Sequence, residues 1–199
     1  MRRISLTLSL AFLTVLFCQA QVTPLKFNKN GEFKIVQFTD IHFQYHNPAS
    51  AIALKRINEV LDAERPDLIV FTGDVVYAPP ADTAMRAVLD CASSRKIPFV
   101  VTFGNHDNEQ GKTRAELYDI IRSMPYNIQP DRGSVESPDY VLTVKSSDGK
   151  KDASVLYCLD SHSYSKLPDV KGYDWLTFDQ VNCCLLYTSP SPRDTERSR

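Results

Sequence analysis

Three short motifs carry the groups in this sequence that are best suited to metal chemistry. They are Asp40-Ile41-His42, Gly73-Asp74 and Gly104-Asn105-His106-Asp107, and each follows a run of apolar residues. Carboxylate and amide oxygens bind hard divalent cations, and imidazole binds borderline ones. In a parallel sheet, residues that follow successive strands meet at one edge. The residue types and their spacing therefore predict a site where two divalent metals surround a phosphate.

The first two motifs supply the expected charged ligands. Asp40 and His42 lie two residues apart, so both side chains can lean toward one face and chelate one metal. Asp74 is expected to bridge two cations, because a carboxylate has two oxygens and the preceding Gly73 permits a close backbone approach. Each motif alone is also typical of an ordinary turn, so the prediction depends on the order and spacing of all three.

The third motif supplies a neutral ligand and a candidate acid. The amide oxygen of Asn105 is expected to bind the second metal. His106 is then poorly placed for the same ion and is expected to face the substrate, where its imidazole can protonate a leaving oxygen. Two roles stay open for Asp107, which either orients His106 in catalysis or caps a helix or turn.

The apolar periodicity predicts the elements that position these motifs. Expected strands cover residues 33–39, 67–72 and 97–103, and expected helices run from about 50 to before 66, from 81 to 95 and from 113 to 124. This βαβαβ order predicts a parallel sheet covered by helices. Residues 140–144 and 153–159 flank Asp148-Gly149 and predict an antiparallel hairpin.

At these residues the chain resembles the calcineurin-like metallophosphoesterase superfamily, and within it the purple-acid-phosphatase-like branch. The segments that carry the resemblance are FKIVQFTDIHF, ERPDLIVFTGDVVY, IPFVVTFGNHD and LYCLDSHSYSKLPDVKGYDW, which together extend over most of residues 32–182. The resemblance implies an α/β (α+β) fold with a β-sandwich flanked by helices, of which the N-terminal βαβαβ part and the following hairpin are present here.

The resemblance also implies a dinuclear metal centre and a hydrolytic activity. Asp40 and His42 would bind the first metal, Asp74 would bridge and Asn105 would bind the second, with His106 as the catalytic histidine. Two divalent or mixed-valence ions of iron, zinc or manganese would then activate a bridging hydroxide to attack phosphorus. The expected substrate is a phosphorylated small molecule or another phosphoester.

The chain departs from the family pattern at two points. Tyr77 stands where purple acid phosphatases have a tyrosine ligand, but His42 is present as well, so Tyr77 is expected to form a wall of the site, with metal binding by its phenol as the alternative. The family also completes its centre with a further histidine and a G-H-x-H motif, which this sequence lacks. His46 is expected to face solvent or to lie at the rim of the pocket rather than to bind metal, and His162 could reach the edge of the site but matches no family ligand. A non-catalytic truncated fragment with an incomplete metal site is therefore the alternative hypothesis.

Both ends of the chain have an unusual composition. Residues 1–20 combine a basic start with an apolar stretch and a small residue at the expected cleavage point, which predicts a secretory signal peptide and export to the periplasm or the extracellular space. Lipid attachment at Cys18 is the alternative. Residues 183–199 are rich in Ser, Pro and Arg and resemble translated adapter DNA, so we expect a non-native tail, with a disordered native tail as the alternative. Residues 21–182 are then the N-terminal portion of one metallophosphoesterase domain.

Charge and cysteine content narrow the partners of that domain. The whole sequence has 23 basic and 24 acidic residues. Without the charged residues of the two ends, 18 basic and 22 acidic residues remain, which gives a net charge of −4. This balance disfavours nucleic-acid binding. No transmembrane segment is expected in the mature chain. Cys91 and Cys158 fall in a helical and a strand pattern, so both are expected to be buried packing residues.

Overall fold

The computed structural model describes residues 24–182 of the chain. The expected signal peptide at 1–20, with Cys18, and the expected tail at 183–199 lie outside the described residues. No helix within 24–182 is long and apolar enough to span a bilayer.

A parallel three-stranded sheet forms the centre of the structure. Its strands lie in the order β1 (Ile35–Phe38), β2 (Leu68–Thr72) and β3 (Phe99–Thr102), and they are joined by the helices α1 (Ala51–Glu64) and α2 (Ala81–Ser93). A short 3-10 turn, Pro48–Ser50, leads into α1. The expected βαβαβ order and the parallel sheet are confirmed.

The elements after the sheet are a further helix and the expected hairpin. A 3-10 turn, Asp107–Glu109, precedes α3 (Arg114–Arg122), and β4 (Tyr140–Lys145) pairs antiparallel with β5 (Asp152–Cys158). The helix α3 begins with a capping box, in which Thr113 and Glu116 exchange hydrogen bonds between side chain and backbone. Such a box satisfies two amide groups that the first helical turn leaves without partners.

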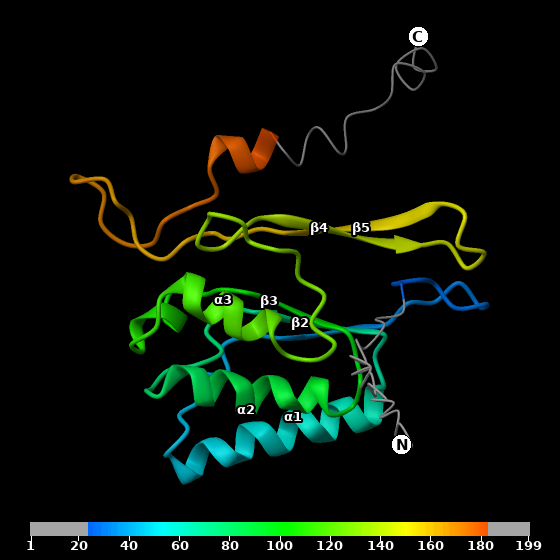
Figure 1. Cartoon of the computed structure of the whole chain (residues 1–199), viewed down its shortest axis with the longest axis horizontal. Coiled ribbons are helices and arrows are strands. Elements are labelled where there is room, and N and C mark those ends of the chain that lie inside the picture. Colours follow the sequence, from blue (N-terminus) through cyan, green and yellow to red (C-terminus); the bar gives the residue numbers. More distant parts are fainter. Residues whose placement is uncertain (1–23, 183–199) are drawn as a thin grey trace, which may run out of the picture.

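The two faces of the sheet pack against different layers (Figure 1). Ile69 and Phe71 of β2 are fully buried in the main core with α1, α2 and α3, whereas Val70 between them packs with the hairpin. Alternate strand residues point to opposite faces, which explains this division. Figure 1 shows α1 and α2 on one side of the sheet and the hairpin on the other.

The hairpin is attached to the sheet through a small apolar cluster. Val100 of β3 is fully buried against Tyr140 and Cys158, and the Tyr140 hydroxyl donates a hydrogen bond of 3.3 Å to the carbonyl of Val101. Cys91 and Cys158 are both buried free cysteines, as expected.

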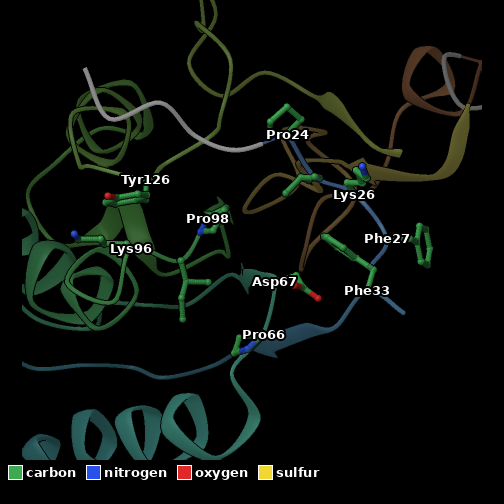
Figure 2. A pocket seen from close by; sticks show the side chains of 11 residues that line it. Pro24, Lys26, Phe27, Phe33, Pro66, Asp67, Lys96, Pro98 and Tyr126 are labelled. Carbon is green, nitrogen blue, oxygen red and sulfur yellow. The ribbon is translucent and has the colours of Figure 1, made fainter. Parts of the chain in front are cut away.

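A wide cavity lies at the amino ends of the strands. It has a volume of about 640 Å³, and it is bordered by Asp67 and Pro98, which precede β2 and β3. Figure 2 shows Tyr126 on one side of this opening and Phe33 on the other. Parallel sheets bind their ligands at the carboxyl ends of the strands, so this cavity is separate from the predicted metal site.

Substitution of a core leucine tests this packing. Leu117→Ala in α3 removes a side chain that is fully buried, and we expect a loss of about 2–5 kcal/mol in the free energy of unfolding. Leu167→Ala is the matched control, because Leu167 is 52% exposed and its truncation should cost less than about 0.5 kcal/mol. Urea denaturation followed by circular dichroism measures both values, and equal losses would contradict the packing described here.

Candidate metal centre

The loops after β1 and β2 run side by side at the carboxyl edge of the sheet. The Asp40 amide donates to the carbonyl of Gly73 at 3.1 Å, and the His42 amide donates to the carbonyl of Asp74 at 2.9 Å. These bonds continue the pairing of the two strands beyond their ends, and they bring the first two motifs together.

Three of the predicted ligands form a compact cluster. Ligand atoms of Asp40, His42 and Asp74 all lie within 4.8 Å of one another, and Nε2 of His42 lies 3.8 Å from a carboxylate oxygen of each aspartate. Asp74 is buried and Asp40 is exposed, so the cluster opens to solvent on one side. Two carboxylates and one imidazole at this separation suit a divalent cation such as iron, zinc or manganese.

The backbone of all three cluster residues is left-handed. The φ angles are 51° at Asp40, 48° at His42 and 50° at Asp74. Residues other than glycine seldom adopt this conformation, and each instance costs on the order of 1–3 kcal/mol. Such strain gathers at functional sites, where the surrounding structure enforces the geometry.

Two glycines allow the second and third motifs to approach each other. A Cβ atom on Gly104 would lie 2.1 Å from Oδ1 of Asp74, and a Cβ atom on Gly73 would lie 2.7 Å from the backbone of Gly104. Neither distance is possible for a real side chain, so glycine is required at both positions. The sequence predicts this role for Gly73 only.

The side chain of Asp107 accepts hydrogen bonds from the backbone of the loops after β2 and β3. Its carboxylate is fully buried and accepts four hydrogen bonds from backbone amides; these belong to Asp74, Val75, Val76 and Gly104, at 2.8–3.1 Å. Burial raises the pKa of this carboxyl, and its bonds to the amides oppose the shift. Of the two roles left open, the structure therefore supports the turn-stabilising one, because the main chain occupies both carboxylate oxygens.

His106 lies beside the cluster and pairs with a residue that no motif includes. Its ring centre is 5.5 Å from that of His42, and its backbone amide donates to Oδ1 of Asp74 at 2.9 Å. Nδ1 of His106 lies 2.6 Å from a carboxylate oxygen of Glu109. This hydrogen bond raises the pKa of His106 and lowers the pKa of Glu109.

Tyr77 forms a wall between the two histidines. Its ring centre lies 5.0 Å from the ring of His42 and 5.0 Å from the ring of His106, in edge-to-face arrangements. This position agrees with the expectation of a wall residue, and metal binding by the phenol stays an open alternative. His46 is exposed in the loop that precedes α1, also as expected.

Asn105 faces a small cavity beside the cluster. The cavity has a volume of about 210 Å³, and Asp40, Asp74, His162 and Tyr173 are among its lining residues. His162 thus lies at the edge of the site, a position that the sequence leaves possible. The predicted ligand Asn105 shares this cavity with both aspartates of the cluster.

A buried ion pair between Arg114 and Asp160 contacts the loop of the third motif. One guanidinium nitrogen of Arg114 lies 2.9 and 2.8 Å from the two carboxylate oxygens of Asp160, and another donates to the carbonyl of Gly104 at 2.8 Å and to the hydroxyl of Ser163 at 2.9 Å. These bonds join α3, the Gly104 loop and the segment after β5. No sequence motif marks Arg114 or Asp160, because the pair is 46 residues apart and forms only in the folded chain.

Comparison with known proteins places the chain in a family. Residues 33–188 match the family described as calcineurin-like phosphoesterase. The chain is 34% identical over 189 residues to the probable inactive purple acid phosphatase 29 of Arabidopsis thaliana, covering 81% of this chain and 48% of that protein. It is 30% identical over 175 residues to phosphatase DCR2 of Saccharomyces cerevisiae, covering 75% of this chain and 30% of that protein. The chain therefore belongs to the calcineurin-like metallophosphoesterase family, and the resemblance seen in its motifs is confirmed.

The relatives are longer proteins, and their names differ in what they say of activity. The chain spans about half or less of the length of both relatives. One is named a phosphatase and the other a probable inactive one. Members of this family of phosphoester hydrolases typically bind two metals, and the described residues contain one cluster of Asp and His side chains that could hold a metal.

Substitution of the buried carboxylate tests its role in the site. In Asp107→Asn one oxygen is replaced by an amino group, so two buried backbone amides lose their acceptor. At roughly 1–3 kcal/mol for each unsatisfied donor, we expect a loss of about 2–5 kcal/mol in unfolding free energy. Chemical denaturation measures this loss, and Asp169→Asn, at an exposed position, is the control. Equal stability of the two variants would contradict the role of Asp107.

The His106–Glu109 pair predicts a pH effect in the metal-free protein. The pair favours the protonated ring, so its contribution to stability is present below the ordinary histidine pKa of 6.5 and is lost as the pH rises through the raised value in the folded state. Glu109→Gln should return the pKa of His106 toward 6.5, and Glu136→Gln, at an exposed position, should not. An NMR titration of the ring protons measures both. An unchanged pKa in Glu109→Gln would show that the pair does not form.

Proposed function

We propose that this chain is part of a metal-dependent phosphatase that hydrolyses phosphate esters. The observation that carries the proposal is the convergence of Asp40, His42 and Asp74, whose ligand atoms lie within 4.8 Å of one another. Membership of the calcineurin-like family and the phosphatase activity in the name of the yeast relative support it.

The residues of the site have distinct proposed roles. Asp40, His42 and Asp74 would hold one cation, and Asp74 and Asn105 would hold the second. Bound iron, zinc or manganese ions would neutralise phosphate oxygens and acidify a water molecule. The small cavity that contains Asn105 leaves room beside the aspartates for a phosphate group.

His106 is the proposed proton donor. Its ring centre lies 5.5 Å from that of the cluster residue His42, and its hydrogen bond with Glu109 raises its pKa, so the ring keeps a proton to higher pH than an ordinary histidine. A protonated imidazole beside the substrate can donate to the leaving oxygen as its bond to phosphorus breaks. Asp107 acts on this chemistry only through the loops that it holds together.

A non-catalytic fragment that binds metal is the second candidate function. Among the described residues, the proposed second cation has only Asp74 and Asn105 as ligands, whereas the first has three. A centre with so few protein ligands binds its metal weakly. A relative named as probably inactive is consistent with this candidate.

We also propose that the protein is exported and that its substrate is a small phosphorylated molecule. Export is proposed from the basic and apolar pattern of residues 1–20. The substrate class is proposed from the cavity of about 210 Å³, which suits a compact phosphate ester.

Two histidines close in sequence provide a matched test of the function. His42→Ala removes a cluster ligand, whereas His46→Ala removes an exposed imidazole four residues away. We expect His42→Ala to weaken Mn²⁺ binding by more than about tenfold and to abolish hydrolysis of p-nitrophenyl phosphate, and we expect His46→Ala to change neither.

Calorimetry and a colorimetric assay measure these two quantities. Binding without hydrolysis in the unsubstituted chain would favour the non-catalytic fragment. Equal Mn²⁺ affinity in both variants would contradict the proposed metal site.

A further inference from the structure

Glu109 joins two predicted site residues in one chain of hydrogen bonds. Its Oε2 atom lies 2.6 Å from Nδ1 of His106, and its Oε1 atom accepts a hydrogen bond of 3.0 Å from the hydroxyl of Tyr164. The oxygen of that hydroxyl accepts a hydrogen bond of 3.2 Å from the side-chain amide of Asn105. Tyr164 is also stacked on Tyr173, with ring centres 5.8 Å apart, which steadies its hydroxyl.

The chemistry of a carboxylate fixes the direction of every bond in this chain. The hydrogen bond with His106 lowers the pKa of Glu109, so the carboxyl is ionised near neutral pH and can only accept. Nδ1 of His106 must therefore carry a hydrogen, and the Tyr164 hydroxyl must point to Glu109. Because that hydroxyl has only one hydrogen, its oxygen can only accept from the remaining neighbour. Asn105 must then turn its amino group toward Tyr164.

The directions of these hydrogen bonds determine which atoms of His106 and Asn105 stay free to contact a substrate or a cation. A neutral imidazole with its hydrogen on Nδ1 keeps a lone pair on Nε2, and in the charged ring Nε2 carries the proton that can be donated. An amide whose amino group is held by Tyr164 has its oxygen on the other side. That oxygen can bind a cation, whereas an amino group in its place would repel one.

We propose that Glu109 is a positioning residue, which selects the Nδ1–H tautomer of His106 directly and, through Tyr164, the orientation of Asn105 that leaves its oxygen free for a cation. The importance of this selection for catalysis rests on the proposed function. The hydrogen-bond directions themselves exist in the protein without metal, so they can be tested separately.

Replacement of Glu109 by glutamine is the informative substitution. His106 and Tyr164 face different oxygens of Glu109, and glutamine replaces one of these oxygens by an amino group, so in the same placement it can accept from only one of the two neighbours. In Glu109→Gln, one of the two hydrogen bonds must therefore be lost or reversed, either the one from His106 or the one from Tyr164. Tyr164→Phe should release Asn105 alone and leave the tautomer of His106 unchanged.

The experiment is an NMR measurement on the isotope-labelled, metal-free chain at a pH where His106 is neutral. The ¹⁵N shifts of the ring report which nitrogen carries the hydrogen, and an Overhauser contact between the Asn105 amino group and the Tyr164 ring reports the orientation of the amide. We expect the Nδ1–H form and the contact in the unsubstituted chain and in the controls Glu136→Gln and Tyr126→Phe. We expect Glu109→Gln to lose at least one of the two features.

A second measurement tests whether the orientation of Asn105 affects the affinity for a cation. Calorimetry with Mn²⁺ should show a loss of roughly 10–100-fold in affinity for the weaker site in Tyr164→Phe, as is usual when a group that orients a ligand is removed. If Glu109→Gln keeps both NMR features, the proposal is overturned. If the NMR features change as expected but the unsubstituted chain binds no Mn²⁺, the positioning role stands and the proposed function fails.

Discussion

The site depends on the four hydrogen bonds that the buried carboxylate of Asp107 accepts from the main chain. These bonds tie the turn at Asp74, after β2, to the turn at Gly104, after β3. A buried carboxylate that lacked such partners would be strongly destabilising, so the two turns and Asp107 are stable only in combination. Together with the bond from the His106 amide to the Asp74 carboxylate, this side chain fixes the relative position of the second and third motifs.

The strained backbone of the candidate ligands is a consequence of the same arrangement. Asp40, His42 and Asp74 all have positive φ angles, and at roughly 1–3 kcal/mol each their combined cost is large for a domain of this size. Bonds between the loops after β1 and β2 and the bonds to Asp107 offset this cost. The glycine at position 104 removes the remaining obstacle, because any side chain there would collide with the Asp74 carboxylate.

Much of the fold could be predicted because its signals are local. Each helix and strand has its own apolar period, and the alternation of the two gives the parallel order. The observed strands are shorter than expected: β1 and β3 each begin two residues later and end one residue earlier, and the chain enters the site loops directly after Phe38 and Thr102. The cluster of Asp40, His42 and Asp74 could be predicted as well, because strand ends in a parallel sheet converge.

The supporting residues could not be predicted, since their roles arise from loop conformation. The bond between Glu109 and His106 depends on a 3-10 turn that no apolar period indicates. The contact between Tyr164 and Asn105 joins residues that are 59 positions apart. The sequence leaves two roles open for Asp107, and the four amides around its carboxylate favour the turn-stabilising one.

We expect Asp40, His42 and Asp74 to bind one divalent cation together. Anomalous X-ray scattering from crystals of this chain grown with Mn²⁺ tests this expectation most directly. We expect an anomalous peak within about 2.0–2.6 Å of ligand atoms from all three residues. A structure with Mn²⁺ bound elsewhere, or with these three side chains turned away from one another and no peak between them, would contradict it.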